Sequence, residues 1–406
     1  MARIRLLIGS HLCTATRARR VARTLAEAGH DVTIQGAWYD RTLIARDESL
    51  LLKAPYHFEP VVNLCRHGVL PRLRRRLGLE RWRRFGRFSP HGLGYGVREH
   101  LRAAQCAAAD LTIAHSAGTL WVAERLAAQR FRVGVDFEDW FSEIVRPDQV
   151  RHYPVEPLRN LERTLLRVAR YRLAPSRAMA RALGEFAGVE PPHPVYNVFP
   201  LADLHAPAPP ATDRRNHRLP SLYWAEERIE PGRGLRALFG ALPHLHHPVE
   251  VHLRGELSGH DRKWFNHEVP ADWRERIIVH PTVHASEQLP RIASHDIGLA
   301  LESGATRGRD LTIANKTFHY LLAGLAVAAT DTTGHEEIAD TAAGAAMKLV
   351  PPDDPIALAA ALDVWLAFPE HLKLARKAAV RATKEIFCWE QVREGLLDEV
   401  ALALAD

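Results

Sequence analysis

Short apolar runs alternate with longer amphipathic stretches along most of the chain, which is the pattern of strands followed by helices. Ile4–Gly9 reads as a buried strand, Ala18–Ala28 as an amphipathic helix and Val32–Ile34 as the next strand. The same half of the chain predicts strands at Leu111–Ala114, Val133–Asp136 and Tyr171–Ala174, with a charged helix at Pro157–Arg170. A parallel sheet with helices on its faces is therefore expected.

A second series of the same kind occupies the C-terminal half. It predicts strands at Leu222–Ala225, Val249–Arg254, Ile277–Val279 and Ile297–Leu301, and helices at Leu235–Leu242 and Glu287–Ile292. Between the two series, residues 201–220 are rich in Pro, Ala and polar residues and lack periodicity, which is the composition of a linker. We therefore expect two Rossmann-like α/β domains, at 1–200 and 221–385, and a C-terminal helix at 386–406.

The composition agrees with this organisation. The chain has 406 residues, of which 47% are hydrophobic, enough for two domains of about 200 residues each. Its longest apolar runs, such as Leu321–Ala329, fall short of the ~20 residues that a membrane-spanning helix needs, and the N-terminus lacks the pattern of a signal peptide. The four cysteines form no Cys-x-x-Cys pair, so neither a zinc site nor a disulfide framework is expected.

Positive charge is concentrated in one segment. The formal net charge is +6, and residues 70–88 contain eight arginines against one Glu. Leu73, Leu77, Trp82 and Phe85 give this segment an apolar side, so it could lie on an anionic membrane surface. A solvated loop or helix fits equally well, whereas nucleic acid is disfavoured because no recognisable nucleic-acid-binding motif accompanies the arginines.

Residues 315–327 carry the first candidate chemistry. Their sequence, NKTFHYLLAGLAV, reads as a helix that begins near Asn315, breaks at Gly324 and leads into a short apolar strand. With Asn315 as N-cap, the helix would direct its N–H groups and positive dipole end toward the carboxyl edge of the sheet, where phosphates bind and Lys316 would add charge. An ordinary helix–strand unit with a solvated lysine fits this spacing equally well.

The same stretch resembles the NK-x-FEY-x-x-AG-x-PV motif in the nucleotide-sugar domain of family 4 glycosyltransferases. Other stretches resemble this family in the same order, among them VDFEDWFSE at 135–143, VYNVFP at 195–200, EERIEPGRGL at 226–235 and GHEEI at 334–338. The resemblance implies the GT-B fold, in which two Rossmann-like domains face a cleft and the last helix packs back on the N-terminal domain.

The resemblance implies a donor site in the second domain. Arg228 and Arg233 match the family's cationic loop and flank Pro231–Gly232 before a helix, where two guanidinium groups can grip a diphosphate. Many family members carry a Glu-x7-Glu pair that is missing here: His319 stands at its second position, and Glu302 could substitute. The implied donor-binding residues are Arg228, Arg233, Glu302, Asn315, Lys316, His319, Gly334 and Glu337.

The first domain would hold the acceptor, through Gly9, His11 and Arg17. Its candidate catalytic residues are His115, Asp136, Glu138 and Asp139. The carboxylates could orient an acceptor hydroxyl, stabilise positive charge that develops on the sugar, or cap a helix. In a chain with 23 histidines, a structural role for His115 is as compatible with the sequence as a catalytic one.

These implications together describe a hexosyltransferase-like enzyme that moves a sugar from a nucleoside diphosphate sugar to an unidentified acceptor. If residues 70–88 contact a membrane, we expect this acceptor to be lipid-linked. Retention of configuration and independence of a metal ion come from the resemblance alone, and no cofactor is expected. A nucleotide-sugar epimerase or hydrolase and a catalytically silent GT-B partner protein are the alternatives. We expect a cytoplasmic location, peripheral at the inner face of the membrane if the arginine-rich segment binds lipid.

Overall fold

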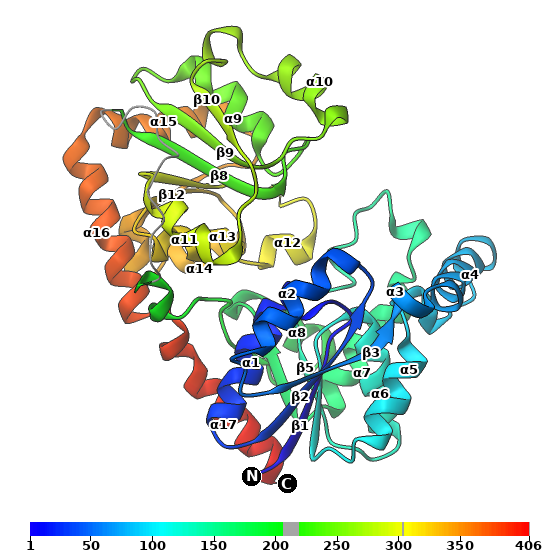
Figure 1. The fold of residues 1–406 in the computed structure, drawn as a ribbon. Coiled ribbons are helices and arrows are strands. Elements are labelled where there is room, and N and C mark those ends of the chain that lie inside the picture. The colour runs from blue at the N-terminus through cyan, green and yellow to red at the C-terminus, as the bar shows by residue number, and fades with distance from the viewer. Residues whose placement is uncertain (206–218, 303, 406) are drawn as a thin grey trace. The chain divides into compact units, whose positions relative to one another are not determined.

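The computed structural model describes residues 1–205, 219–302 and 304–405, and the chain divides into two units. The first unit comprises Met1–Val195 together with Arg393–Asp406, and the second comprises Tyr196–Val392 (Figure 1). Most of the expected linker, residues 206–218, lies outside the described residues. The C-terminal helix α17 (Trp389–Ala405) returns the chain to the first unit, as predicted.

The first unit is built on a seven-stranded parallel sheet with the order β3-β2-β1-β4-β5-β6-β7. Its strands are β1 (Arg3–Leu7), β2 (Asp31–Trp38), β3 (His57–Asn63), β4 (Leu111–Ala114), β5 (Val133–Asp136), β6 (Tyr171–Ala174) and β7 (His193–Pro194). Three of them, β4, β5 and β6, have the predicted bounds, and all of their residues except Arg172 are buried.

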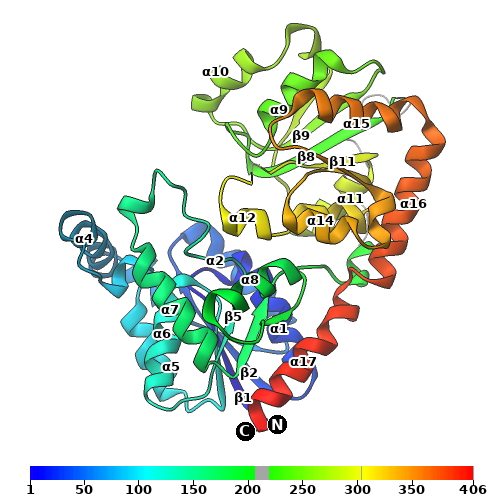
Figure 2. The ribbon, with the colours of Figure 1, turned by 180° about the vertical axis from the view of Figure 1, so that it is seen from behind.

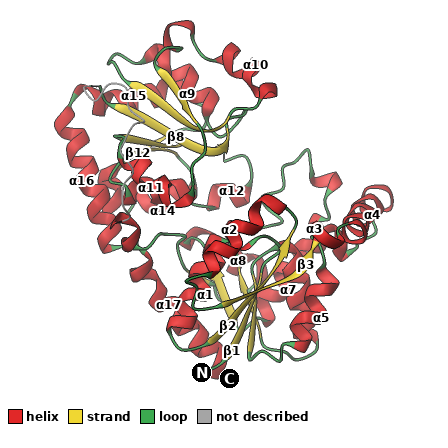
Figure 3. Ribbon diagram, in the orientation of Figure 1, coloured by secondary structure: helices red, strands yellow, loops and turns green. Residues whose placement is uncertain are grey.

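Helices connect these strands, as the sequence pattern predicts for crossovers between parallel strands. They are α1 (Thr16–Glu27), α2 (Arg41–Leu51), α3 (Leu64–His67), α4 (Val69–Phe85), α5 (Val97–Cys106), α6 (Ala117–Ala128), α7 (Val155–Val168) and α8 (Arg177–Ala187). Short 3-10 turns lie between them, namely η1 (Leu12–Thr14), η2 (Pro90–Gly92) and η3 (Val150–His152). In both units the strands form a central layer with helices around it (Figure 3).

The second unit has a six-stranded parallel sheet with the order β10-β9-β8-β11-β12-β13. Its strands are β8 (Ser221–Arg228), β9 (Glu250–Glu256), β10 (Ile277–His280), β11 (Ile297–Ala300), β12 (Ala326–Thr330) and β13 (Met347–Val350). Its helices are α9 (Leu235–Ala241), α10 (Gly259–Glu268), α11 (Ala285–Ala293), α12 (Arg307–Leu311), α13 (Asn315–Leu322), α14 (Thr333–Ala339), α15 (Pro355–Ala367) and α16 (Pro369–Glu385). The prediction of two parallel α/β domains is confirmed.

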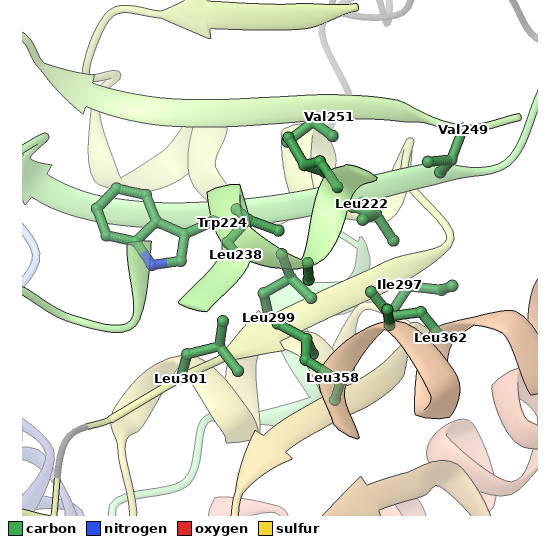
Figure 4. Close-up of a cluster of buried hydrophobic side chains, with 14 of the residues drawn as sticks. Leu222, Trp224, Leu238, Val249, Val251, Ile297, Leu299, Leu301, Leu358 and Leu362 are labelled. Atoms are coloured by element: carbon green, nitrogen blue, oxygen red, sulfur yellow. The ribbon is translucent and has the colours of Figure 1, made fainter. Parts of the chain in front are cut away.

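The core of the second unit explains why β8, β9 and β11 read as apolar runs. Alternate side chains of these strands point to one face of the sheet and pack there with α9 and α15 (Figure 4). The buried residues labelled in that view are Leu222, Trp224, Leu238, Val249, Val251, Ile297, Leu299, Leu301, Leu358 and Leu362. This packing fixes the carboxyl ends of β8 and β11 as neighbours.

Both sheets reverse their strand order at one point, between β1 and β4 in the first unit and between β8 and β11 in the second. In open parallel sheets, ligands bind outside the carboxyl ends of the strands at such a reversal. A ligand site is therefore expected among the described residues that follow β1, β4, β8 and β11.

The two passages of the chain between the units run beside each other. The backbone N–H of Trp389 donates to Phe199 O at 3.0 Å, and the N–H of Leu201 donates to the carboxylate of Glu390 at 3.1 Å. Within the described residues, no helix is long and apolar enough to cross a membrane.

Candidate functional site

A cluster of charged side chains lies at the strand reversal of the second sheet, with Glu302 at its centre. Glu302 follows β11, and its carboxylate pairs with Arg233 Nη1 at 3.1 Å and with Lys316 Nζ at 3.0 Å. The ammonium group of Lys316 also lies 2.8 Å from Glu226, near the end of β8. Arg309 on α12 approaches Glu302 at 3.9 Å. The structure thus joins three predicted donor residues, Arg233, Glu302 and Lys316, to two that the sequence analysis did not identify.

The backbone around Arg233 is held in a conformation that aims its side chain at Glu302. Arg233 has a positive φ of 50°, and its carbonyl accepts a hydrogen bond from the indole N–H of Trp224 at 3.1 Å. Gly234, with φ 75°, comes so close to Leu301 that a Cβ would lie 2.1 Å from the leucine Cβ. Only glycine fits there, so the loop after β8 is forced against the end of β11.

The charged groups of this cluster hold one another in their ionised forms. Burial alone would raise the pKa of Glu302, but Lys316 and Arg233 hold this pKa below its usual range. The carboxylate is therefore ionised at neutral pH, although its side chain is only 9% exposed. Arg233, Arg309 and Lys316 face Glu226 and Glu302, and Glu230 also acts on Arg233. Burial would lower the pKa of Arg233, and the facing carboxylates raise it instead.

Arg228 lies apart from this cluster. Its guanidinium pairs with Asp261 at 3.3 Å and with Glu230 at 3.7 Å, and its side chain is 54% exposed. Asp261 belongs to α10, which follows β9. Arg228 and Arg233 therefore flank the Pro-Gly turn, as the sequence indicated, but in this structure they pair with different carboxylates.

The start of α13 differs from the sequence prediction. Asn315 is the first residue of the helix and not its N-cap; the N-cap is Ala314, whose side chain cannot accept a hydrogen bond. The amide oxygen of Asn315 instead accepts a hydrogen bond from Asn197 Nδ2 at 2.8 Å. The N-cap prediction was wrong because an asparagine side chain caps a helix only when its own backbone is non-helical, whereas Asn315 already belongs to the helix.

His319 on α13 and Glu337 on α14 contact residues 196–199, at the start of the second unit. The ring of His319 stacks on Phe199, with centroids 3.6 Å apart. Glu337 accepts a hydrogen bond from the hydroxyl of Tyr196 at 2.5 Å. Gly334 lies against α12, where a Cβ would come within 2.7 Å of Thr312 O. Lys316 and His319 thus reach different partners, although they are three residues apart on one helix.

The first unit has its own charged cluster at the carboxyl ends of β1, β4 and β5. Arg17 Nε donates to both carboxylate oxygens of Asp136, at 2.9 and 2.8 Å, and both side chains are almost completely buried. His115 Nδ1 lies 3.1 Å from Glu138 and 3.6 Å from Asp136. Because both neighbours of Nδ1 are carboxylates, this nitrogen carries a hydrogen.

This arrangement leaves one imidazole nitrogen unoccupied. Among the described residues, buried His115 Nε2 has no hydrogen-bond partner, nor has Nη2 of Arg17. Burial would lower the pKa of Arg17, but Asp136 and Glu138 hold this pKa above its usual range. Asp139 follows Glu138 in the same loop and is partly exposed. The sequence placed these residues in one region, and the structure brings Arg17, His115, Asp136 and Glu138 into contact.

His11 binds the loops next to this cluster. Its Nδ1 lies 2.7 Å from the buried carboxylate of Asp47, and its Nε2 accepts from the backbone N–H groups of Tyr39 and Asp40 at 3.0 Å. Both ring nitrogens are occupied, so His11 holds the loop after β2 in place. Gly9 packs against Ser116, whose Oγ would lie 2.9 Å from an added Cβ.

Glu162 on α7 supports the loop that carries Glu138. It is completely buried, and its carboxylate accepts hydrogen bonds from the backbone N–H of Ser142 at 3.0 Å and from the Ser142 hydroxyl at 2.5 Å. Burial raises the pKa of Glu162 to about 7, although these hydrogen bonds oppose the shift. The sequence analysis had no signal for this residue, because it is one of several carboxylates on an amphipathic helix.

Comparison with known proteins bears on the fold. No protein-family model matches the chain, and no curated protein matches it by sequence. Among solved structures, HepE (Alr3699) of Anabaena in complex with UDP and glucose aligns with 99% of this chain and 100% of its own, with 16% identity and a TM-score of 0.69. Sucrose-phosphate synthase from Thermosynechococcus elongatus aligns over the same shares, with 15% identity and a TM-score of 0.72.

UDP-GlcNAc 2-epimerase from Neisseria meningitidis bound to UDP-GlcNAc is also similar, with 13% identity and a TM-score of 0.60 over 98% of this chain and 100% of that chain. These similarities confirm the expected GT-B fold. In the part of the chain that the structure describes, no group of three or more His, Cys, Asp or Glu residues could hold a metal ion.

Glu302→Gln is expected to lower the free energy of unfolding by about 2 kcal/mol, because it removes charge-assisted hydrogen bonds from partly buried cations. Urea unfolding at neutral pH measures this loss. Glu226→Gln is the matched control: Glu226 is more exposed, at 24%, and pairs with Lys316 alone in this cluster, so its loss should be smaller. Equal losses in the two variants would contradict the central position of Glu302.

Glu162→Gln is expected to change the pH dependence of stability. The unfolded chain releases the proton of Glu162 near its ordinary value of 4.5, whereas the native state keeps it until about pH 7. The wild type should therefore lose stability as pH rises through this window, by up to about 3 kcal/mol, and the variant should lack this loss. Urea unfolding at about pH 5 and about pH 8 tests this, with the exposed Glu156→Gln as control. A wild-type-to-variant difference that is the same at both pH values would rule it out.

Proposed function

We propose that this protein transfers a sugar from a nucleoside diphosphate sugar to an acceptor. The observation that carries the proposal is the cluster in which Glu302 holds Arg233 and Lys316 together at the strand reversal of the second sheet. Parallel α/β sheets bind nucleotides at this edge. The solved structure of HepE with UDP and glucose has the same fold, and this supports a nucleotide-sugar donor.

Arg233 and Lys316 are suited to a diphosphate leaving group. When the bond between the sugar and the diphosphate breaks, negative charge develops on the phosphate oxygens, and cations held in advance stabilise that charge. The Arg233 side chain is 40% exposed and keeps N–H groups that do not bind Glu302, so a ligand can reach it. Because these side chains supply the positive charge, the reaction needs no metal ion in this proposal.

The acceptor binds to the first unit in this proposal. In this proposal Glu138, whose side chain is 29% exposed, orients the acceptor hydroxyl, and the buried imidazole of His115 holds Glu138 in place through Nδ1. Membership of family 4, retention of configuration and a cytoplasmic location complete the proposal, and the first two rest on the resemblance of the motifs.

Two other functions remain alternatives. The similar fold of a UDP-GlcNAc 2-epimerase favours an epimerase or hydrolase, which would turn over the donor when no acceptor is present. The absent Glu-x7-Glu pair favours a catalytically silent partner protein, which no nucleotide would stabilise. The position of Glu302 beside Arg233 and Lys316 argues against a silent protein, because the cluster retains a carboxylate among the cations.

Nucleoside diphosphates and their sugar conjugates should stabilise the protein against heat. A ligand at about 100 times its dissociation constant adds about 2.7 kcal/mol to the free energy of unfolding, which raises the melting temperature measurably. A thermal-shift panel over the common bases and sugars measures this. Stabilisation by none of the diphosphates would overturn the proposal, and consumption of the stabilising sugar nucleotide without acceptor would favour the epimerase or hydrolase.

Arg233→Ala should lower the transfer rate by about 10²-fold or more, the scale of losing one preorganised donor to developing negative charge. The variant should also lose some stability, because the nearly buried carboxylate of Glu302 loses one of its cations, so the rates are compared at a temperature at which both proteins are folded. Arg236→Ala on α9 is the matched control, since Arg236 is 65% exposed and pairs with Glu268 outside the cluster. A normal rate in the Arg233 variant would remove this residue from the donor site, and Arg228→Ala tests the second arginine of the loop in the same assay.

A further inference from the structure

Helix α4 belongs to the first unit and has one face packed on its neighbours. Gly78 touches η2 so closely that a Cβ would lie 2.9 Å from Gly92 N. The guanidinium of Arg75 lies over the ring of Tyr95, 4.6 Å from the centroid, and Arg74 pairs with Glu99 at 2.9 Å. These contacts fix which side of the helix faces away from the unit, at whose edge α4 lies in both views (Figures 1 and 2).

The outward face is apolar. Val69, Leu73 and Leu77 are spaced by four residues, and Leu70 lies three residues before Leu73, so these side chains share one face of the helix. Their exposed fractions are 79%, 47%, 57% and 62%, in the order just given. Phe85 at the end of the helix is 70% exposed. One helix thus carries five of the fifteen large hydrophobic residues that the described part of the chain exposes, which marks a contact surface.

Arginines border and extend this apolar face. Arg72, Arg76 and Arg83 lie along one side of it, and Arg81 and Arg84 continue it four and seven residues after Leu77. All five are exposed. Within the described residues, Arg76, Arg81 and Arg83 make no ion pair, whereas Arg84 pairs with Glu80. The unpaired guanidinium groups are free to meet anionic groups of a partner.

We propose that this face of α4 binds the surface of an anionic lipid bilayer. Leucine and phenylalanine side chains would enter the boundary between headgroups and acyl chains, and the arginines would contact the phosphates. Charge complementarity decides the partner: a second copy of the chain would bring arginines against arginines, and a nucleic acid would leave the leucines in water. η3 packs beside α4 and adds the exposed Val150 and Arg151.

This inference does not rest on the proposed function, because it uses only the composition and exposure of α4. If the protein both binds a bilayer and transfers a sugar, the membrane contact restricts the kind of acceptor. An acceptor that reaches the first unit of a protein held on a bilayer is itself a lipid-linked or membrane-proximal molecule.

Co-sedimentation of the full chain with vesicles tests the inference. The protein should bind vesicles of phosphatidylcholine mixed with phosphatidylglycerol and not vesicles of phosphatidylcholine alone. Binding should weaken when ionic strength rises from about 0.1 M to about 1 M, since the Debye length falls from about 10 Å to about 3 Å. Each basic residue near such a surface contributes about fivefold to partitioning, so the triple variant R76Q/R81Q/R83Q should bind about a hundredfold more weakly.

Two further variants separate the parts of the surface. Leu73→Ser combined with Leu77→Ser should also reduce binding, at unchanged charge. The control K373Q/K377Q/R381Q removes three exposed charges from α16 of the second unit and should bind like the wild type. Equal binding to neutral and anionic vesicles, no binding to either, or equal losses in the α4 and α16 triple variants would overturn the proposal. In the absence of vesicle binding, self-association that the Leu73 and Leu77 changes abolish, or binding of a DNA oligonucleotide that the arginine changes abolish, would also overturn it.

Discussion

The carboxylate of Glu302 determines the chemistry of the second unit's carboxyl edge. It is nearly buried, it stays ionised because Lys316 and Arg233 hold its pKa low, and it keeps these two cations within 3.1 Å. Arg233 and Lys316 would repel each other if they were brought together alone, and the carboxylate of Glu302 between them offsets this repulsion. The hydrogen bond from Trp224 to the carbonyl of Arg233 and the tight contact of Gly234 with Leu301 then orient the loop toward Glu302.

The parallel topology makes such an arrangement available twice in one chain. In both units the strand order reverses once, and side chains that are far apart in sequence come together there, as Arg17 and Asp136 do in the first unit. A buried ion pair of this kind contributes little net stability, because desolvation offsets the attraction, but losing one partner is costly. The pair instead determines position: it holds the first turn of α1 against the end of β5, beside the imidazole of His115.

Periodicity and turn residues predicted the fold well, since short apolar runs such as Leu111–Ala114 form the buried strands of the two sheets. The structure places Arg233 and Lys316 in one charged cluster and His115 and Asp136 in another, whereas the roles of these residues stay predictions. Their partners could not be predicted, because Glu226 meets Lys316 and Arg309 meets Glu302 only through tertiary packing, and no local pattern distinguishes them from other charged residues. Asn315 illustrates the limit of local propensity: it resembles an N-cap, yet Ala314 occupies that position.

The central claim is that Glu302, Arg233 and Lys316 form a site for a diphosphate group. Isothermal titration calorimetry tests it most directly, by comparing the nucleoside diphosphate that best stabilises the protein with the corresponding nucleoside, on the wild type and on Lys316→Met. Two charge-assisted hydrogen bonds of about 1.5 kcal/mol or more each should make the diphosphate bind at least about 100-fold more tightly than the nucleoside. The variant should lose most of this advantage. Equal affinities for the diphosphate and the nucleoside, or an unchanged advantage in Lys316→Met, would contradict the claim.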